Sequence, residues 1–461
     1  MAGPRDLAGP LRDAGFAAAI AAVLGFPLIG FRLVDLAGGE ALATRWPDLA
    51  AAILLVFVGR LALSLIEQGS VRVALVIAVG FGLIGAFATW PSAFLHVMAV
   101  GGAGAIALRA LLAYARRQGV ETGKATDALR PAARALPWAL IGFALLLPAL
   151  PFADRGVLDA AIMIVTYIML GWGLNIVTGL AGLLDLGYVA FFAIGAYTFA
   201  ILGTTLGLSF WECLPLTALL ASGAGLLLGF PVLRLRGDYF AIVTLGFGEI
   251  IRIVAVNWRS LTNGSQGISG VPRPSFFGLA DFTASPPDGH AAFHELFGIE
   301  YSPLQRIVFL YYLILALALA VNLFTLRIRR LPIGRAWEAL REDEIACQSL
   351  GIDRRKVKLA AFAIGAAWGG IAGAFFAARL NFITPESFSF IESAMITAIV
   401  VLGGMGSQLG IVLASVVLIG LPELFREFSE YRMLAFGACM IAIMLFRPRG
   451  LIVTRRPSVT L

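Results

Sequence analysis

The sequence predicts an all-α protein that crosses a membrane many times. Of its 461 residues, 59% are hydrophobic, whereas soluble domains are about 45–50% apolar. The mean hydropathy is +0.89, and apolar runs of about 20 residues, the length that a membrane helix needs, recur along the chain. The 52 glycines favour the same class, because small residues let membrane helices pack closely. We therefore expect a polytopic helical bundle.

Fourteen apolar runs are expected to span the membrane. The first follows Arg5 and Arg12 in the manner of a signal peptide, but it lacks a small-residue cleavage site and is interpreted as an uncleaved span. Several later runs are short or interrupted by glycine, so re-entrant segments stay open as an alternative. The expected spans are 16–34, 49–66, 71–89, 93–113, 136–152, 157–178, 183–206, 213–233, 238–256, 306–327, 356–378, 391–405, 408–424 and 431–446.

Basic residues gather in four places and set the predicted orientation. They lie within 109–134, 234–236, 327–358 and 447–456. Because loops rich in Lys and Arg stay on the cytoplasmic side, all four are expected inside, and the expected spans then place both termini inside as well. The net charge of +7 is explained by these loops beside a lipid bilayer, so we expect no nucleic-acid partner.

A basic cytoplasmic linker, 114–135, divides the chain into two expected regions. Before it, 1–113 forms an accessory N-terminal membrane region of about four spans. After it, 136–452 forms a core of about ten spans, and 453–461 is a cytoplasmic tail. The long connection 257–305 is expected on the outer side, where it either meets an extracytoplasmic partner or serves as an ordered plug or spacer.

No enzymatic site emerges from the sequence. Residues 119–126 read GVETGKAT, which lacks the glycine spacing of a nucleotide-binding loop. Neither a Ser/His/Asp set nor a metal-ligand spacing is found, and the separated cysteines predict no disulfide. We therefore predict a non-enzymatic chain that binds no metal or cofactor of its own. A transporter of this kind uses an ion gradient or the ATPase activity of separate subunits.

The segment 327–358 is the most polar part of the chain, with fourteen charged residues, nine of them basic. Pro332 and Gly334 open a predicted helix and Gly351 ends it, so 334–351 is interpreted as one amphipathic cytoplasmic helix of about four turns. Ala336, Leu340, Cys347 and Leu350 would form its apolar face, while a solvated loop is the plainer alternative. The candidate docking residues are Arg335, Trp337, Glu338, Arg341, Glu342, Asp343, Glu344 and Gly351.

Polar residues and glycines inside the spans indicate a candidate substrate path. Buried polar groups in a membrane are costly and are often functional, and glycine-broken helices often line such paths. Asp185 could instead be a helix cap, Glu249 and Arg252 could form a structural ion pair, and the glycines could serve close packing. The candidate path residues are Asn175, Gly182, Asp185, Tyr188, Gly403 and Gly404.

Four stretches carry a resemblance to a known family. They read GLNIVTGLAGLLDLGYVAFFAIGAY, GRAWEALREDEIACQSLGID, TPESFSFIESAMITAIVVLGGMGSQLG and REFSEYRMLAFGACMIAIMLFRPRGL. In this order they resemble the M-type permease family of branched-chain amino-acid ABC importers, over 136–452. The region 1–113 resembles the extra membrane region of the longer members, which favours amino-acid importers over the shorter urea-type relatives.

The resemblance implies a fold, partners and a role for the polar segment. The fold would be an ABC importer transmembrane bundle in the bacterial inner membrane, forming half of a path for Leu, Ile and Val. A second, H-type permease would complete the path, two cytoplasmic ATP-binding subunits would hydrolyse ATP, and a periplasmic binding protein would deliver the substrate. Residues 334–351 would be the coupling helix that docks on an ATPase subunit.

Three alternatives to this function stay open at the level of sequence. A urea or short-amide ABC permease shares similar motifs. A gradient-driven carrier would need a carboxylate within the membrane, for which only Asp185 and Glu249 qualify. A membrane scaffold without transport activity is disfavoured by the glycine-broken helices.

Overall fold

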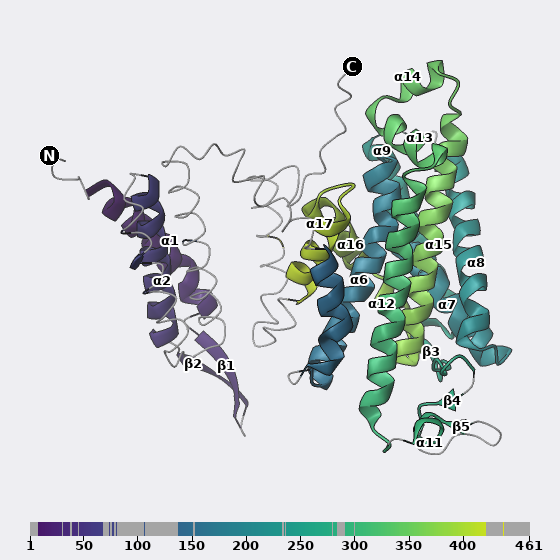
Figure 1. Ribbon diagram of the computed structural model, residues 1–461, viewed down its shortest axis with the longest axis horizontal. Coiled ribbons are helices and arrows are strands. Elements are labelled where there is room, and N and C mark those ends of the chain that lie inside the picture. Colours follow the sequence, from purple (N-terminus) through teal and green to yellow (C-terminus); the bar gives the residue numbers. More distant parts are fainter. Residues whose placement is uncertain are drawn as a thin grey trace. The chain divides into compact units, whose positions relative to one another are not determined.

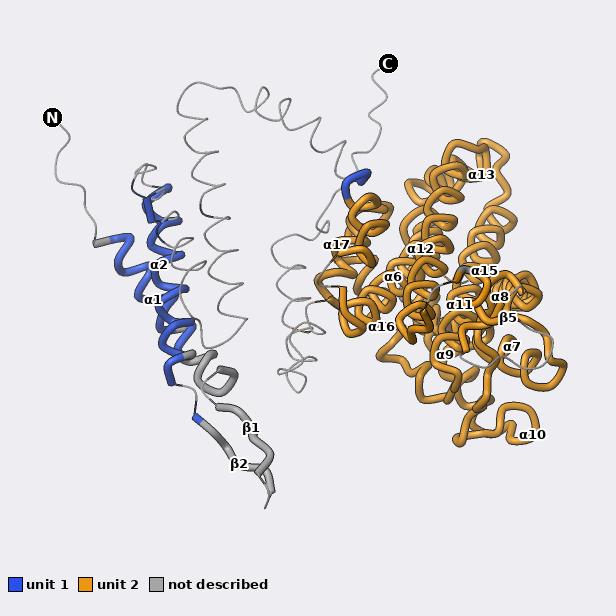
Figure 2. Tube along the Cα trace, turned by 60° about the horizontal axis from the view of Figure 1, so that its bottom comes forward, with its two compact units in different colours: residues 1–139 blue, residues 140–461 orange. Residues whose placement is uncertain are grey.

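In the computed structural model, the described residues are mostly helical, with a few short strands (Figure 1). The chain folds into two compact units, 1–139 and 140–461 (Figure 2). The structure describes residues 8–29, 31–36, 39–44, 46–67, 137–150, 153–232, 237–278, 280–283, 291–298 and 300–420, together with the single positions 73, 76, 77, 80, 106, 235 and 437.

Within residues 8–67 of the first unit, the structure describes two helices and a hairpin. Helix α1 (Ala8–Ile29) packs against α2 (Trp46–Glu67), and the antiparallel strands β1 (Phe31–Leu36) and β2 (Gly39–Thr44) lie between them in the chain. Helix α2 contains a candidate membrane span at Leu49–Ile66. The end of the span expected at 16–34 is wrong, because α1 ends at Ile29 and residues 31–34 belong to strand β1.

The second unit is a helical bundle with six of the seven candidate spans that the described residues contain. An all-α polytopic membrane protein is therefore confirmed. The expected spans 71–89, 93–113 and 431–446 lie outside the described ranges. The six spans are formed by α6 (Arg155–Asn175) with its extension, α8 (Phe210–Val232), α9 (Asp238–Asn257), α12 (Pro303–Ile328), α15 (Arg354–Leu380) and α16 (Phe390–Gly403), joined by shorter apolar helices at Pro137–Ala149, α7 (Val189–Thr205) and Gln408–Gly420.

Helix α15 lies at the centre of this bundle and packs against α6, α7, α8 and α12 (Figure 1). Glycines set its distance from α7. A Cβ built on Gly195 of α7 would lie 2.0 Å from the carbonyl oxygen of Gly370, and one built on Gly373 would lie 2.0 Å from that of Phe192. Real side chains do not fit at such distances, so these glycines let the two backbones touch, as in other membrane bundles.

The two ends of the bundle differ in structure. At one end, α12 and α15 are joined by α13 (Pro332–Glu342) and α14 (Glu344–Ser349) (Figure 1). At the other end, the connection expected at 257–305 forms small ordered elements, and its strand β3 (Ile268–Ser269) pairs with β6 (Phe382–Ile383). The structure also describes there α10 (Arg259–Thr262), a 3-10 helix (Gly264–Gln266), β4 (Ala280–Asp281), β5 (Ala291–Ala292) and α11 (Phe293–Phe297).

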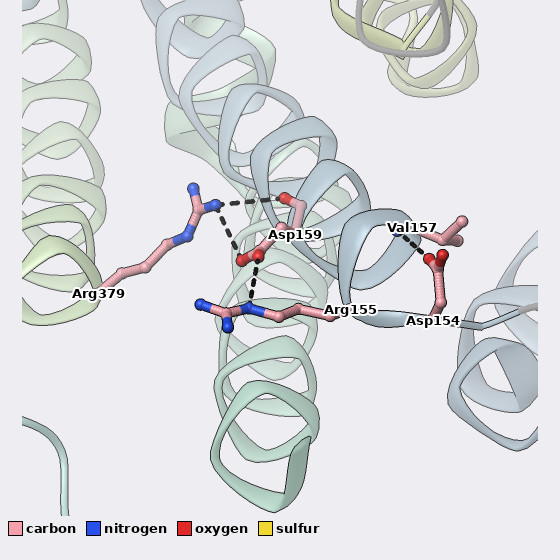
Figure 3. Close-up of polar contacts among 5 residues, drawn as sticks. All are labelled: Asp154, Arg155, Val157, Asp159 and Arg379. Atoms are coloured by element: carbon pink, nitrogen blue, oxygen red, sulfur yellow. Dashed lines mark hydrogen bonds and ion pairs between the residues drawn. The ribbon is translucent and has the colours of Figure 1, made fainter. Parts of the chain in front are cut away.

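An ion-pair cluster also joins helices at this second end. Asp154 caps α6 by accepting a hydrogen bond from the amide of Val157 at 2.8 Å. One turn further, the carboxylate of Asp159 lies 3.3 Å from Arg379 of α15 and 3.9 Å from Arg155, and Figure 3 shows both guanidinium groups pointing toward it. The start of α6 is therefore fixed against the end of α15.

Candidate translocation and coupling site

The first helix break follows α6. Its last turn continues as a π-helix at Ile176–Leu180, a widening that is frequent at functional sites. Gly182 then turns the chain at φ +74°, and α7 begins at Val189. A residue with a Cβ would be strained at that backbone angle, so glycine is required for the turn. The discontinuous helix that the sequence predicts is present here.

The second break separates α16 from α17 (Gln408–Ser415). Gly404 and Gly406 have φ angles of +101° and +88°, which turn the chain twice within three residues. The hydroxyl of Ser407 accepts a hydrogen bond from the amide of Gly410 at 3.1 Å and caps the start of α17. This second discontinuity places backbone amide and carbonyl groups inside the bundle.

Asn175 joins the two breaks. Its side chain is fully buried, and its Oδ1 accepts a hydrogen bond from the amide of Gly406 at 2.8 Å. The contact needs a glycine at position 179, because a Cβ there would lie 1.8 Å from Asn175 Oδ1 and 2.6 Å from the Gly406 nitrogen. Two glycine-containing segments that are far apart in sequence therefore lie side by side.

Three buried side chains at the first break keep polar atoms without a hydrogen-bond partner among the described residues. These atoms are Nδ2 of Asn175, Oγ1 of Thr178 and Oδ2 of Asp185. Leaving a buried polar group unpaired costs about 1–3 kcal/mol, and such groups in a native fold usually serve water, an ion or a ligand. The break can thus offer both donors and an acceptor to a small polar molecule.

Asp185 uses one carboxylate oxygen for a local turn. Its Oδ1 accepts a hydrogen bond from the amide of Gly187 at 2.8 Å, just before α7. Thr244 lies beside the carboxylate, but its hydroxyl donates to the carbonyl of Ala241 at 3.0 Å. Thr244 therefore donates no hydrogen bond to the second oxygen of Asp185. The local turn satisfies only one of the two carboxylate oxygens.

The other candidate path residues, and the pair expected as a structural ion pair, serve different contacts. Tyr188 is fully buried and donates its hydroxyl to the carbonyl of Gly365 at 2.8 Å, which fixes the start of α7 against α15. Glu249 and Arg252 form a salt bridge along α9, and both side chains are partly exposed. Gly403 packs directly on Gly410 across the second break.

The polar segment forms two helices instead of the single helix expected at 334–351. The chain leaves helical geometry at Asp343, whose carboxylate accepts hydrogen bonds from the amides of Ile345 and Ala346 at 2.8 and 3.0 Å. Aspartate is a strong helix N-cap, so it ends α13 and begins α14. Gly351 follows α14 with φ +82°.

The buried face of these helices also differs from the expected one. Trp337 is fully buried and donates its indole N–H to the carbonyl of Val357 at 2.8 Å, which holds α13 against α15. Leu340 and Cys347 are buried as expected, but Leu350 is 80% exposed. The break at Asp343 changes the helical phase, and Leu350 therefore leaves the face that a continuous helix would give it.

Most of the charged candidates of this segment have partners within the chain. Glu338 forms a salt bridge with Arg329 at 2.8 Å, and Glu344 forms one with the buried Lys358 of α15. Arg341 donates a hydrogen bond to the carbonyl of Gly179 in the first break. Arg335, Arg341, Glu342 and Asp343 are all exposed residues.

Sequence reasoning misses Arg329 and Lys358 as functional neighbours. Each is one of nine basic residues in 327–358, and composition alone does not separate the residues that face inward from those that face water. For Lys358, a signal exists, because it lies two residues inside the expected span 356–378, where a charged side chain needs a partner.

This membrane bundle contains helices broken by glycine, and a polar helical segment packs against the breaks. These features are typical of membrane transport bundles. A family model described as "Branched-chain amino acid transport system / permease component" matches residues 156–444, and the chain belongs to this permease family. The resemblance found in the sequence is confirmed. A second model, a domain of unknown function, matches residues 10–76.

Curated relatives carry the same description. The chain is 53% identical over 324 residues to the high-affinity branched-chain amino acid transport system permease protein LivM of Escherichia coli (strain K12), covering 70% of this chain and 76% of that protein. It is 54% identical over 315 residues to LivM of Salmonella typhimurium, covering 68% and 74%. To LivH of Escherichia coli it is 26% identical over 305 residues, covering 64% and 92%. No solved structure matches the chain.

Proposed function

We propose that this chain is the permease subunit of an ATP-driven importer for the branched-chain amino acids Leu, Ile and Val. The observation that carries the proposal is the 53% identity to a LivM protein over 70% of the chain. The relatives described above are all named for branched-chain amino acids, which favours these substrates over urea or short amides.

The chain forms one half of the translocation path and needs partners for the other functions. A second permease related to LivH supplies the other half, since this chain is similar to both LivM and LivH. Two cytoplasmic ATP-binding subunits hydrolyse ATP, and a periplasmic binding protein delivers the amino acid. The chain lies in the bacterial inner membrane with both termini inside, which places α13 and α14 on the cytoplasmic side, as their basic charge favours.

The path runs beside the two helix breaks. Asn175, Thr178 and Asp185 offer polar atoms that lack partners among the described residues, and a free amino acid carries an ammonium and a carboxylate that require such atoms. A path must also release its cargo, so a few polar groups among apolar neighbours suit transport better than a tight pocket. Broken membrane helices meet these requirements, because their free backbone groups face a cavity or protein.

Uptake in a strain lacking its own branched-chain importers tests the function. Expressing this chain with its partner permease, ATPase subunits and binding protein should restore uptake of labelled leucine, and omitting the ATPase subunits should abolish it. Labelled urea serves as the comparison substrate. Restored urea uptake without leucine uptake would reject the proposed substrate, and uptake without ATPase subunits would favour a gradient-driven carrier.

A further inference from the structure

Helix α13 contacts the end of the first broken helix. Helix α6 and its π-helical extension end near Gly179, and helix ends leave their last carbonyl groups without intrahelical partners. The guanidinium of Arg341 donates a hydrogen bond to the carbonyl oxygen of Gly179. The stem of Arg341 lies over the following turn, since a Cβ built on Gly182 would lie 2.9 Å from its Cγ. A positive charge also suits the negative end of the helix dipole.

The second broken helix has a similar contact. Helix α16 ends at Gly403, and the guanidinium of Arg329 lies 3.5 Å from the carbonyl oxygen of Gly406 in the turn that follows. The same guanidinium is held by Glu338 of α13 at 2.8 Å. A guanidinium with several donors can bind two acceptors at once. Arg329 therefore links α13 to the second break.

These contacts close a ring, because Asn175 already ties the two breaks to each other through the amide of Gly406. Helix α13 cannot move relative to the two breaks while all three links stay intact, since each is a hydrogen bond of limited reach. Separating the breaks must also break the Asn175 link. The three contacts therefore couple the position of α13 to the distance between the two breaks.

Helix α13 is also fixed to the spans that flank it. Trp337 donates to the carbonyl of Val357 in α15, and a Cβ built on Gly334 would lie 2.2 Å from the carbonyl oxygen of Ile328 in α12. The salt bridge between Glu344 and Lys358 holds α14 to α15 in the same way. A force applied to α13 or α14 thus reaches α12, α15 and both breaks together.

We propose that Arg341 and Arg329 are positioning residues that transmit movement of α13 to the two helix breaks and so link ATP hydrolysis to opening of the path. This proposal rests on the proposed function, in which an ATPase subunit docks on α13 and α14. Neither arginine needs to touch substrate or ATP. Arg341 holds a backbone carbonyl at the end of the first broken helix, Arg329 holds one in the turn that follows the second, and the docked ATPase changes the path through these two bonds.

The proposal is tested by measuring ATP hydrolysis and leucine transport in a reconstituted transporter that contains all partner subunits. Arg341→Gln removes the charge and the reach to Gly179, and we expect assembly and ATP hydrolysis within about twofold of the unmodified complex. Leucine transport should fall about tenfold, the effect of losing roughly one hydrogen bond to a charged group. The ATP consumed per leucine should then rise about tenfold. Arg341→Lys, which keeps a charged donor, should recover part of the coupling.

Arg259→Gln is the matched control, because it removes an exposed arginine from α10 at the opposite end of the bundle. It should keep the unmodified ratio of ATP to leucine. If Arg341→Gln fails to assemble, Arg329→Gln gives a second test, since it removes the guanidinium that lies between Glu338 and the carbonyl of Gly406. It too should raise the ratio.

Two outcomes separate failure of this proposal from failure of the proposed function. If the unmodified complex takes up leucine and the Arg341 and Arg329 variants keep its ATP-to-leucine ratio, the two arginines are only structural. If the unmodified complex hydrolyses ATP but takes up no leucine, the substrate assignment is wrong, whatever the variants do.

Discussion

At the scale of single residues, Gly179 meets two neighbours that leave no room for a side chain. We predict that Gly179→Ala reduces leucine uptake strongly, because its Cβ would lie within 1.8 Å of Asn175 Oδ1 and 2.6 Å of the Gly406 nitrogen. Overpacking of this kind costs about 1–3 kcal/mol, and we expect the bond between the two breaks to be lost first. Uptake assays with the assembled transporter and a thermal stability measurement would show both effects.

Gly223→Ala is the control for this prediction. Gly223 lies in α8, and a Cβ built on it has no atom within 4 Å. Alanine is favoured over glycine in a helix by about 1 kcal/mol, so this variant should keep normal uptake and equal or higher stability. Equal uptake by the two variants would mean that the Asn175–Gly406 contact is not needed for transport.

The sequence predicts the polar residues of the site better than their roles. A buried asparagine beside glycines is visible as a candidate, because polar groups inside a membrane are rare and costly. The hydrogen bond between Asn175 and Gly406 cannot be predicted in this way, because the two residues are 231 positions apart in the sequence. In the sequence, Tyr188 is a candidate path residue because its hydroxyl is polar. In the structure, this hydroxyl holds α7 against α15.

At the scale of helices, the polar segment shows that apolar periodicity predicts helical structure but does not tell whether the helix is continuous. The apolar spacing in 334–351 is helical in both α13 and α14, but the chain changes direction at Asp343. An aspartate preceding two amides can cap a helix as well as lie on its surface. Substitutions at Asp343 would therefore unfold the start of α14 and would not report on docking alone.

Exposed apolar residues on and beside α14 give a cleaner test of docking. Ile345 and Leu350 are 70% and 80% exposed, and apolar side chains on the aqueous side of a polar segment favour a protein partner. We predict that Ile345→Ala with Leu350→Ala weakens co-purification of the ATPase subunit by tenfold or more, since interface anchors typically contribute over about 1 kcal/mol each. Binding assays with the purified permease would measure the loss.

Leu219→Ala provides the comparison for that pair. Leu219 is 69% exposed on α8, a candidate membrane span, so the same truncation there removes apolar surface away from the polar segment. Co-purification should be unchanged in this variant. Normal ATPase binding by the α14 pair would place the docking surface elsewhere on the chain.

At the scale of the whole molecule, composition and span length predict the membrane bundle, because bilayer thickness fixes the length of each apolar helix. Ten expected spans have a matching apolar helix in the described residues outside α1. The hairpin of β1 and β2 was not expected, since the apolar run that ends in residues 31–34 continues the hydropathy of α1. Hydropathy alone does not mark where a helix gives way to a strand.

The division into two units leads to a prediction about the N-terminal region. The permease family model matches only residues that lie in the second unit, and LivH is covered over 92% of its length by a match of 305 residues. That relative therefore has little sequence beyond a permease region of this size. We predict that a chain beginning at Arg116 still supports part of the leucine uptake.

The truncation must be tested for assembly and transport separately, because loss of the first unit removes buried residues such as Leu55 and Leu65. Co-purification with the partner permease and ATPase subunits measures assembly, and uptake of labelled leucine measures transport. Both helix breaks and α13 remain in the truncated chain, so the linkage between ATP hydrolysis and transport should persist. A truncated complex that assembles and hydrolyses ATP but moves no leucine would show that residues 1–113 contribute to the path itself.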